Sequence, residues 1–315
     1  MKKVVWMFSG QGAQYHSMAE ELYRTQPVFR SALERGDAVV RPLINASVVE
    51  EIYRTRDRAL PFRRTLFTHP AILLIEWALA EYLGSLHQRP DAVLGYSLGE
   101  LTSLVVSGSL SIEDALVLVV KKAELVEYLV APGGMLAVLD APDLMDRQPQ
   151  CFRGLELAAV NFRNNFVVAG PSEAIQSAQT QLKALGVVNV ALPVSHSFHS
   201  KEMKPIDVPM RHLLDQIVFR SPKIPVISAT LGRVTEVAKD HFYRVTREPV
   251  RFARVLEDLE AEGSWLYVDL GPSGSMVTAV KYNLPPGSRS EFLALVTPFG
   301  QEQKNIDRYL DRVRH

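Results

Sequence analysis

The stretch that most constrains the fold is DAVLGYSLGELTSLVVSG, residues 91–108. Its first part is a short apolar run typical of a buried strand, and its last part is typical of a helix. Between them, Gly95 and Gly99 flank Ser97 in the pattern G-x-S-x-G, which is typical of a sharp strand-to-helix turn that presents a serine hydroxyl. Glycine suits both positions because a side chain there would collide with neighbouring backbone. Ser97 is therefore a candidate nucleophile, with a purely structural serine as the alternative.

Short apolar segments alternate with helical segments on both sides of this turn. Ser111 with Asp114 three residues later forms a weak helix-capping pattern. We predict strands at 4–8, 91–97, 223–229 and 264–271. We predict helices at 17–40 with a break near Pro27, from Pro70 to about Leu83, at 98–108, from Ser111 through 129, at 249–263 and at 275–284. Such alternation favours a mainly parallel sheet covered on both faces.

The pattern changes between residues 130 and 195. A strand at 133–141 precedes a hairpin over 155–170, an amphipathic helix over 172–186 and a further strand at 188–195. This order is that of a split βαβ unit. We therefore predict an α/β protein with a large α/β-hydrolase-like domain over 1–129 and 196–315, built on a parallel sheet. A small ferredoxin-like α+β subdomain is inserted over 130–195.

The composition excludes several classes of function. The 35 Lys and Arg residues balance the 35 Asp and Glu residues, so no net charge favours nucleic acid or an anionic membrane. The single cysteine, Cys151, excludes a disulfide within the chain and favours a reducing compartment. The first residues lack the apolar region of a secretory signal, and Glu76 and Glu81 interrupt the apolar segment 71–83. We expect a cytoplasmic protein that binds neither nucleic acid nor membrane.

A nucleophilic serine needs a general base, and histidine is the usual one. His196 and His199 stand where the predicted insert returns to the large domain, and active sites favour such junctions. The residues alone do not choose between these two, and either could be a hydrogen-bonded structural histidine. His315 is terminal, and we expect surface positions for His16, His87, His212 and His241.

Four segments together carry a resemblance to a known family. They are FSGQGAQY (8–15), GYSLGE (95–100), FHSKEMKP (198–205) and VDLGPSGSM (268–276). In this order and spacing, the chain resembles the malonyl-CoA:acyl-carrier-protein transacylases and the acyltransferases of polyketide synthases. The resemblance covers essentially the full length, including the ferredoxin-like insert.

The resemblance implies roles for particular residues. Ser97 would carry the acyl group as an ester, and His199 would act as general base and acid, oriented mainly by a backbone carbonyl. The backbone N–H groups of Gln11 and Leu98 would stabilise the oxyanion. Further positions that the resemblance places near the substrate are Asn161, His196 and Phe198, with Phe198 limiting room for a branched acyl group.

The resemblance also implies ping-pong chemistry. An acyl thioester on coenzyme A or on an acyl carrier protein would acylate Ser97, and the phosphopantetheine thiol of a carrier protein would then accept the acyl group. No metal or other cofactor is needed in such chemistry. By resemblance, we expect a monomer whose partners are an acyl carrier protein and its acyl thioester.

Three positions depart from the family pattern. Where malonyl-handling members have an arginine, this chain has Lys122, which lacks the planar fork that holds a carboxylate by two hydrogen bonds. A lysine that points to solvent or pairs with Glu124 or Glu127 is the alternative for this position. Tyr96 and His69 stand where relatives usually have histidine and glutamine. These changes resemble a divergent branch whose members are similar to acyl hydrolases that remove stalled acyl chains from carrier proteins.

We therefore predict an acyltransferase-family serine enzyme of polyketide biosynthesis that favours hydrolytic removal or transfer of non-malonyl acyl groups. Transfer and hydrolysis share the acyl-serine and differ only in whether a thiol or water attacks it. The alternatives are a malonyl-CoA:acyl-carrier-protein transacylase and, more distantly, an α/β-hydrolase serine esterase. In the esterase, the histidine would come late in the chain. A docking or scaffold subunit without activity is the non-enzymatic alternative.

Overall fold

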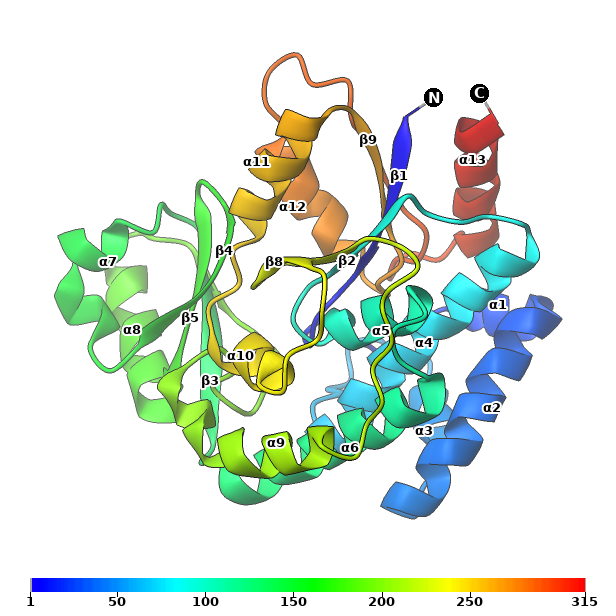
Figure 1. The fold of residues 1–315 in the computed structure, drawn as a ribbon. Coiled ribbons are helices and arrows are strands. Elements are labelled where there is room, and N and C mark those ends of the chain that lie inside the picture. Colours follow the sequence, from blue (N-terminus) through cyan, green and yellow to red (C-terminus); the bar gives the residue numbers. More distant parts are fainter. Residues whose placement is uncertain (1, 315) are drawn as a thin grey trace.

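The computed structural model describes residues 2–314 and contains two separate β-sheets (Figure 1). The larger sheet has six strands in the order β10-β9-β1-β2-β7-β8. All neighbouring strands are parallel except β7 and β8, which are antiparallel. Its strands are β1 Lys3–Phe8, β2 Ala92–Gly95, β7 Val226–Ser228, β8 Gly232–Val234, β9 Trp265–Asp269 and β10 Glu291–Ala294. The expected mainly parallel α/β sheet is confirmed, with the short antiparallel strand β8 at one edge.

Helices pack on this sheet from several sides. Helix α5 packs on β1 and β2, whereas α12 packs on β9. The helices that accompany the large sheet are α1 Glu20–Thr25, α2 Pro27–Ile44, α3 Val48–Ile52, α4 Thr65–Ser85, α5 Gly99–Val106, α6 Ile112–Leu129, the 3₁₀ helix η2 Lys201–Ile206, α9 Asp207–Leu214, α10 His241–Arg247, α11 Phe252–Glu262, α12 Ser275–Asn283 and α13 Glu302–Arg314. The predicted break before Pro27 and the Ser111 cap are both present; the Ser111 hydroxyl accepts a hydrogen bond from the Asp114 N–H.

The long apolar helix α4 begins earlier than the sequence predicted. Pro70 lies inside it rather than in its first turn, because the Arg64 carbonyl already accepts hydrogen bonds from the N–H groups of Phe67 and Thr68. The helix is apolar on nearly all sides and is buried against α2, α5 and α6. Within residues 2–314, no helix combines the length and apolar character that crossing a membrane requires.

The smaller sheet has four antiparallel strands in the order β4-β5-β3-β6. A small hydrophobic core, which includes Phe152, Phe166 and Leu182, lies between this sheet and its helices. Its elements are β3 Gly133–Val138, α7 Leu144–Arg147, the 3₁₀ helix η1 Pro149–Phe152, β4 Glu156–Phe162, β5 Asn165–Pro171, α8 Ser172–Ala184 and β6 Asn189–Ala191. These elements lie inside the predicted insert, whose boundaries at 130 and 195 stay a prediction.

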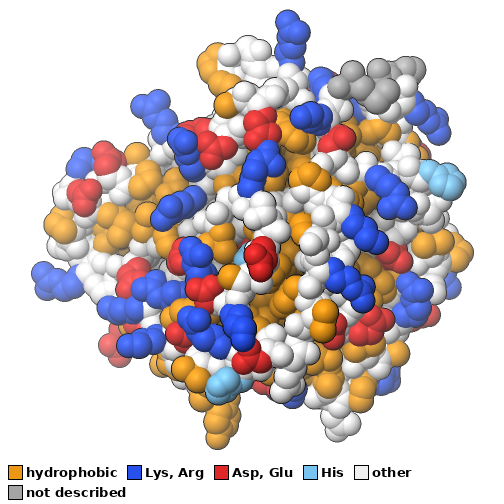
Figure 2. Space-filling model, in the orientation of Figure 1, with side chains coloured by type: hydrophobic (Ala, Val, Ile, Leu, Met, Phe, Trp, Pro, Cys, Tyr) orange, Lys and Arg blue, Asp and Glu red, His pale blue; other side chains and the backbone are white. Residues whose placement is uncertain are grey.

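The two sheets meet beside the carboxyl ends of β1 and β2. The Val160 N–H donates to the Val250 carbonyl, and the Val250 N–H donates to the Ala158 carbonyl. Helices α11 and α12 also contact β4 (Figure 1). On the face shown in Figure 2, Lys and Arg side chains are mixed with Asp and Glu around hydrophobic patches, in keeping with the balanced net charge.

Candidate active site

The turn between β2 and α5 holds Ser97 in a constrained backbone conformation. Its φ angle is 54°, in the left-handed region that residues other than glycine occupy at a cost of about 1–3 kcal/mol. The turn is fixed by the Tyr96 N–H, which donates to the Phe8 carbonyl at 2.9 Å. A Cβ atom on Gly99 would collide with the same carbonyl. The glycine pattern therefore reflects close packing of this turn on the end of β1.

His199 lies opposite Ser97 and is held by three contacts. Its Nε2 is 2.8 Å from Ser97 Oγ, and its Nδ1 is 2.8 Å from the Glu248 carbonyl oxygen. Its backbone N–H donates to the Thr246 carbonyl, and its φ angle is 59°. Because a carbonyl only accepts hydrogen bonds, Nδ1 carries the proton and Nε2 offers its lone pair to the serine hydroxyl.

Burial keeps the His199 imidazole neutral. The side chain is 3% exposed, and desolvation is the main cause that lowers its pKa to about 4. The nearby charge of Lys122 acts in the same direction, whereas the bond to the Glu248 carbonyl opposes it. The histidine is therefore available as a proton acceptor at neutral pH.

Two backbone N–H groups beside Ser97 are suited to an oxyanion. Gln11, in the loop after β1, and Leu98, directly after the serine, line the same cavity as Ser97. Neither N–H donates a backbone hydrogen bond within the described part of the chain. Leu98 also precedes the first turn of α5, whose dipole favours negative charge.

The loop that carries Gln11 is anchored by a buried carboxyl group. Glu76, on α4, accepts hydrogen bonds from the Ser9 N–H at 2.6 Å and from the Ser9 and Thr102 hydroxyls. Burial raises the pKa of Glu76 to about 8. This network ties the loop after β1 to α4 and α5, and so fixes Gln11 relative to Ser97.

The cavity around the serine is small and lies between the two sheets. Its volume is about 60 Å³, and the large-sheet side contributes Ser97, His199 and Lys122. The small-sheet side contributes apolar side chains, namely Met135, Val167, Leu192 and Val194. A groove of about 350 Å³ shares Gly10, Gln11, Tyr96, Val167 and Leu192 with this cavity, so the two hollows are adjacent.

Lys122 lines the cavity and is largely buried. It is 4% exposed, and burial lowers its pKa to about 8, against the smaller opposing effect of Glu100. Among the described residues, its ammonium group has neither an ion-pair nor a hydrogen-bond partner. It is Lys121 that pairs at the surface, with Glu124 at 2.8 Å.

His69 and Phe198 form the wall next to Lys122. His69 is 1% exposed, and its Nε2 is 2.9 Å from Gln11 Oε1. Its pKa lies well below the ordinary value, because of burial first and the Lys122 charge second. The His69 ring packs against Phe198 with centroids 5.6 Å apart.

Tyr96 and Asn161 form a bridge between the sheets. The Tyr96 hydroxyl donates to Asn161 Oδ1 at 2.8 Å, and Asn161 Nδ2 donates to Asn165 Oδ1 at 2.8 Å. Asn161 lines the larger groove and not the cavity around Ser97. His196 also lies outside the cavity lining; it is buried, and its Nδ1 is 3.3 Å from Ser195 Oγ.

The predicted surface positions are wrong for two histidines. His241 is 3% exposed, and its Nε2 lies 2.7 Å from Oε1 of the fully buried Glu100. The two atoms are in close contact, but neither has a hydrogen-bond partner among the described residues. His16 is fully buried and stacks on Phe62. His87 and His212 are exposed as expected, and His315 lies outside the described residues.

Sequence reasoning missed the support that Glu100 gives to α5. Its Oε2 accepts a hydrogen bond from the Ser228 hydroxyl at 2.8 Å, so it links α5 to β7 and α10 behind Ser97. The sequence feature that could have indicated this role is a glutamate one residue after the G-x-S-x-G pattern, at the start of an apolar helix.

Within residues 2–314, no group of three or more His, Cys, Asp or Glu side chains is placed to hold a metal ion.

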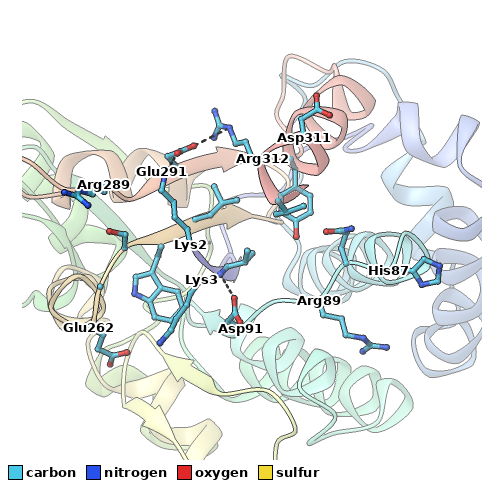
Figure 3. A pocket seen from close by; sticks show the side chains of 18 residues that line it. Lys2, Lys3, His87, Arg89, Asp91, Glu262, Arg289, Glu291, Asp311 and Arg312 are labelled. Carbon is cyan, nitrogen blue, oxygen red and sulfur yellow. Dashed lines mark hydrogen bonds and ion pairs between the residues drawn. The ribbon is translucent and has the colours of Figure 1, made fainter. Parts of the chain in front are cut away.

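A hollow much larger than the Ser97 cavity lies at the other end of the six-stranded sheet. It measures about 1100 Å³ and is lined by residues at the starts of β1, β9 and β10 and on α13 (Figure 3). Some of its charged side chains are paired: Glu291 contacts both Lys2 and Arg312, and Asp91 accepts from the Val4 N–H. Lys3, Arg89 and Arg289 have no ion-pair partner among the described residues. Active sites of parallel α/β sheets lie at the carboxyl ends of the strands. Ser97 and His199 are at that end, and this groove is not.

Comparison with known proteins agrees with this geometry. The acyl transferase domain family matches residues 5–312. The chain is 38% identical to the polyketide biosynthesis acyltransferase homolog BaeD of Bacillus velezensis, over 98% of this chain and 96% of that protein. It is 37% identical to the homolog PksD of Bacillus subtilis, over 96% and 94% of the two chains.

A solved acyltransferase structure has a similar fold. The loading acyltransferase of the avermectin modular polyketide synthase superposes with a TM-score of 0.89 at 27% identity, over 99% of this chain and all of that one. With a family match over nearly the whole chain and relatives above 30% identity, the chain belongs to the acyl transferase family and is an acyltransferase-family enzyme.

Proposed function

We propose that this enzyme acts on acyl thioesters of acyl carrier proteins in polyketide biosynthesis, through an acyl ester on Ser97. We further propose that it favours hydrolytic removal or transfer of non-malonyl acyl groups. One observation carries the proposal: Ser97 Oγ lies 2.8 Å from His199 Nε2, in a small cavity with largely apolar walls. The names of the relatives BaeD and PksD support the setting in polyketide biosynthesis.

In the first half-reaction, Ser97 Oγ attacks the thioester carbon while His199 Nε2 takes the hydroxyl proton. The carbonyl electrons move to oxygen, and the N–H groups of Gln11 and Leu98 stabilise the resulting anion. The C–S bond then breaks, and His199 returns the proton to the leaving thiol. The bond from Nδ1 to the Glu248 carbonyl holds the imidazole in its orientation throughout.

In the second half-reaction, water or another thiol attacks the ester carbon and gives its proton to His199. Collapse of the tetrahedral anion breaks the bond to Ser97 Oγ, which recovers the proton. Lys122 lacks the planar fork of arginine and so offers a carboxylate less geometric specificity. The site therefore lacks a firm carboxylate clamp and accepts acetyl and larger neutral acyl groups.

The groove next to the cavity supports the carrier-protein proposal. It measures about 350 Å³ and reaches the Ser97 cavity at Gln11, Tyr96 and Leu192, which suits the long phosphopantetheine arm. The acyl substrates arrive on this arm of a carrier protein or on coenzyme A, and the enzyme itself uses no cofactor. We propose that it works as a cytoplasmic monomer.

The test follows Ser97 and the carrier protein by intact-protein mass spectrometry. Enzyme is mixed separately with malonyl-loaded and acetyl-loaded carrier protein. We expect the acetyl group to leave the carrier and appear as free acid, with Ser97→Ala and His199→Asn as controls that remain unacylated. Rapid malonyl loading, passage of malonyl to a second carrier and untouched acetyl thioester would contradict the proposal.

That contrary outcome would identify a malonyl-CoA:acyl-carrier-protein transacylase, the second candidate. The observation in its favour is the cationic Lys122 in the cavity wall, which attracts a carboxylate. For the serine esterase alternative, the late histidine His241 contacts Glu100 and not Ser97. Full activity after His199→Asn would revive the esterase, and failure of a serine-directed covalent probe to label the native enzyme would favour an inactive docking subunit.

A further inference from the structure

Two polar groups of residues that line the Ser97 cavity have no hydrogen-bond partners in residues 2–314. One is Nδ1 of His69, whose ring is 1% exposed. The other is the ammonium group of Lys122, which is 4% exposed. The two residues come from α4 and α6, which pack against each other, and the Lys122 charge contributes to lowering the pKa of His69. A polar group held in the protein interior without a partner is unfavourable, so both groups are suited to a ligand.

The hydrogen-bonding character of each group follows from its surroundings. Gln11 Oε1 is an acceptor 2.9 Å from His69 Nε2, so Nε2 carries the proton. Because His69 is neutral, its Nδ1 then offers only a lone pair. The Lys122 ammonium can only donate. His69 and Lys122 therefore bring one acceptor and one charged donor to the lining of the cavity.

Three acyl groups of matched length would interact differently with His69 Nδ1 and the Lys122 ammonium group. A butyryl group ends in a methyl group and leaves both polar groups without a partner. A malonyl group ends in a carboxylate, which attracts Lys122 but turns a lone pair toward the lone pair of His69 Nδ1. A 3-hydroxypropionyl group ends in a hydroxyl, which donates to His69 and accepts from Lys122 at once.

We propose that His69 and Lys122 together select acyl groups that carry a hydroxyl on C3, with the thioester carbonyl carbon counted as C1. The substrate class is a short 3-hydroxyacyl thioester, and the inference rests on the acyl-Ser97 chemistry proposed above. The small volume of the cavity, about 60 Å³, restricts the acyl group to a short chain. A site with groups that match a hydroxyl discriminates strongly against analogues that lack it.

The test measures kcat/KM for acylation of Ser97 by carrier protein loaded with 3-hydroxypropionyl, butyryl or malonyl groups. For the native enzyme we expect 3-hydroxypropionyl to exceed each of the other two by at least about tenfold. His69→Phe removes the acceptor and Lys122→Met removes the donor, and each should reduce the hydroxyacyl-to-butyryl ratio to about one. Lys121→Met, on the neighbouring surface residue, should leave the ratio unchanged.

The ratio of kcat/KM for the hydroxyacyl and butyryl substrates separates substrate selection from a structural effect of the substitutions. His69 also contacts Gln11, so a disturbed oxyanion loop would slow all three substrates alike and leave the ratio intact. That result, or equal native rates for butyryl and 3-hydroxypropionyl, would overturn the inference while leaving the proposed function in place. A native preference for malonyl would overturn it as well. Absence of acylation of Ser97 by any thioester would instead contradict the proposed function.

Discussion

The six-stranded sheet has a hollow at each end. The larger hollow contains charged side chains that pair with one another, whereas the smaller one contains polar groups that lack partners. The hollow at the amino ends of the strands measures about 1100 Å³, but its Lys2, Glu291 and Arg312 side chains are partly exposed and pair with one another (Figure 3). The cavity at the carboxyl ends measures only about 60 Å³, yet His69 Nδ1 is buried there without a hydrogen-bond partner, and the largely buried Lys122 has no ion-pair partner among the described residues.

The comparison shows that the volume of a hollow does not indicate where the groups suited to a substrate lie in this fold. Exposed charges that pair with one another gain little and attract little, because water competes for them. Buried groups without partners are costly and so mark positions where a substrate completes the arrangement. Four experiments can break or sharpen this contrast.

The largest effect is expected at the nucleophile. Ser97→Ala removes the hydroxyl that we propose forms the ester, so acyl release from carrier protein should fall by at least about 10³-fold. Single-turnover assays with acetyl-loaded carrier protein measure it. Residual activity close to the native rate would show that the chemistry lies elsewhere, and the large groove would then have to be reconsidered.

Acid should destabilise the fold through His199. Its folded pKa of about 4 lies below the ordinary value of 6.5, so the unfolded chain binds more protons between these pH values. The contribution of His199 to the free energy of unfolding is fully present above pH 6.5, and it falls by about 3 kcal/mol as the pH drops to 4.

Urea unfolding at pH 7 and at pH 4.5 measures this dependence. His199→Asn should lose less stability on acidification than the native enzyme, and asparagine tolerates the same backbone conformation. His87→Asn, at an exposed position in the large groove with a similar φ of 60°, should behave like the native enzyme. An identical acid response of all three proteins would rule out a buried neutral His199.

Two lysine substitutions should change stability in opposite directions. The pKa of Lys122 is lowered from 10.5 to about 8, so its burial as a cation costs stability at neutral pH, and Lys122→Met should stabilise the fold by about 2–3 kcal/mol. Lys2→Met breaks an exposed ion pair and should destabilise by less than about 1 kcal/mol. Thermal unfolding at pH 7 compares them, and destabilisation by Lys122→Met would mean that the lysine has a partner in solution.

The smallest effect is expected in the large groove. Arg312→Ala removes an ion pair of 3.6 Å to Glu291 and a hydrogen bond to the Phe292 carbonyl. Stability should fall by less than about 1 kcal/mol, and kcat/KM for acyl thioesters should stay within about twofold of the native value. A tenfold loss of activity would assign this groove a role in the reaction.

The local patterns predicted the fold well where a short stretch decides the structure. The strand, turn and helix around Ser97 and the Ser111–Asp114 cap depend on residues a few positions apart, and both are present. The start of α4 was misplaced because Pro70 is compatible with an interior position near the beginning of a helix. The short strands β8 and β10 escaped notice because three or four residues carry too little periodicity.

Features set by distant residues were harder to predict. The burial of His241 depends on Glu100, and that of His16 on Phe62, and neither partner is visible from the neighbouring sequence. The resemblance pointed to Ser97 and His199, which the structure brings within 2.8 Å, but their catalytic roles stay a prediction. The missing partners of His69 and Lys122 follow from packing alone, which no pattern in the sequence displays.

The anchoring of His199 to the Thr246 and Glu248 carbonyls has a consequence for how the protein is made. On the ribosome, Ser97 emerges long before residue 248, and synthesis at about 5–20 residues per second separates the two by many seconds. During that interval the serine has no base and is an ordinary alcohol. In the mechanism proposed above, the nascent chain therefore does not attack thioesters, and its reactivity begins only after the segment with Thr246 and Glu248 has folded to hold the imidazole.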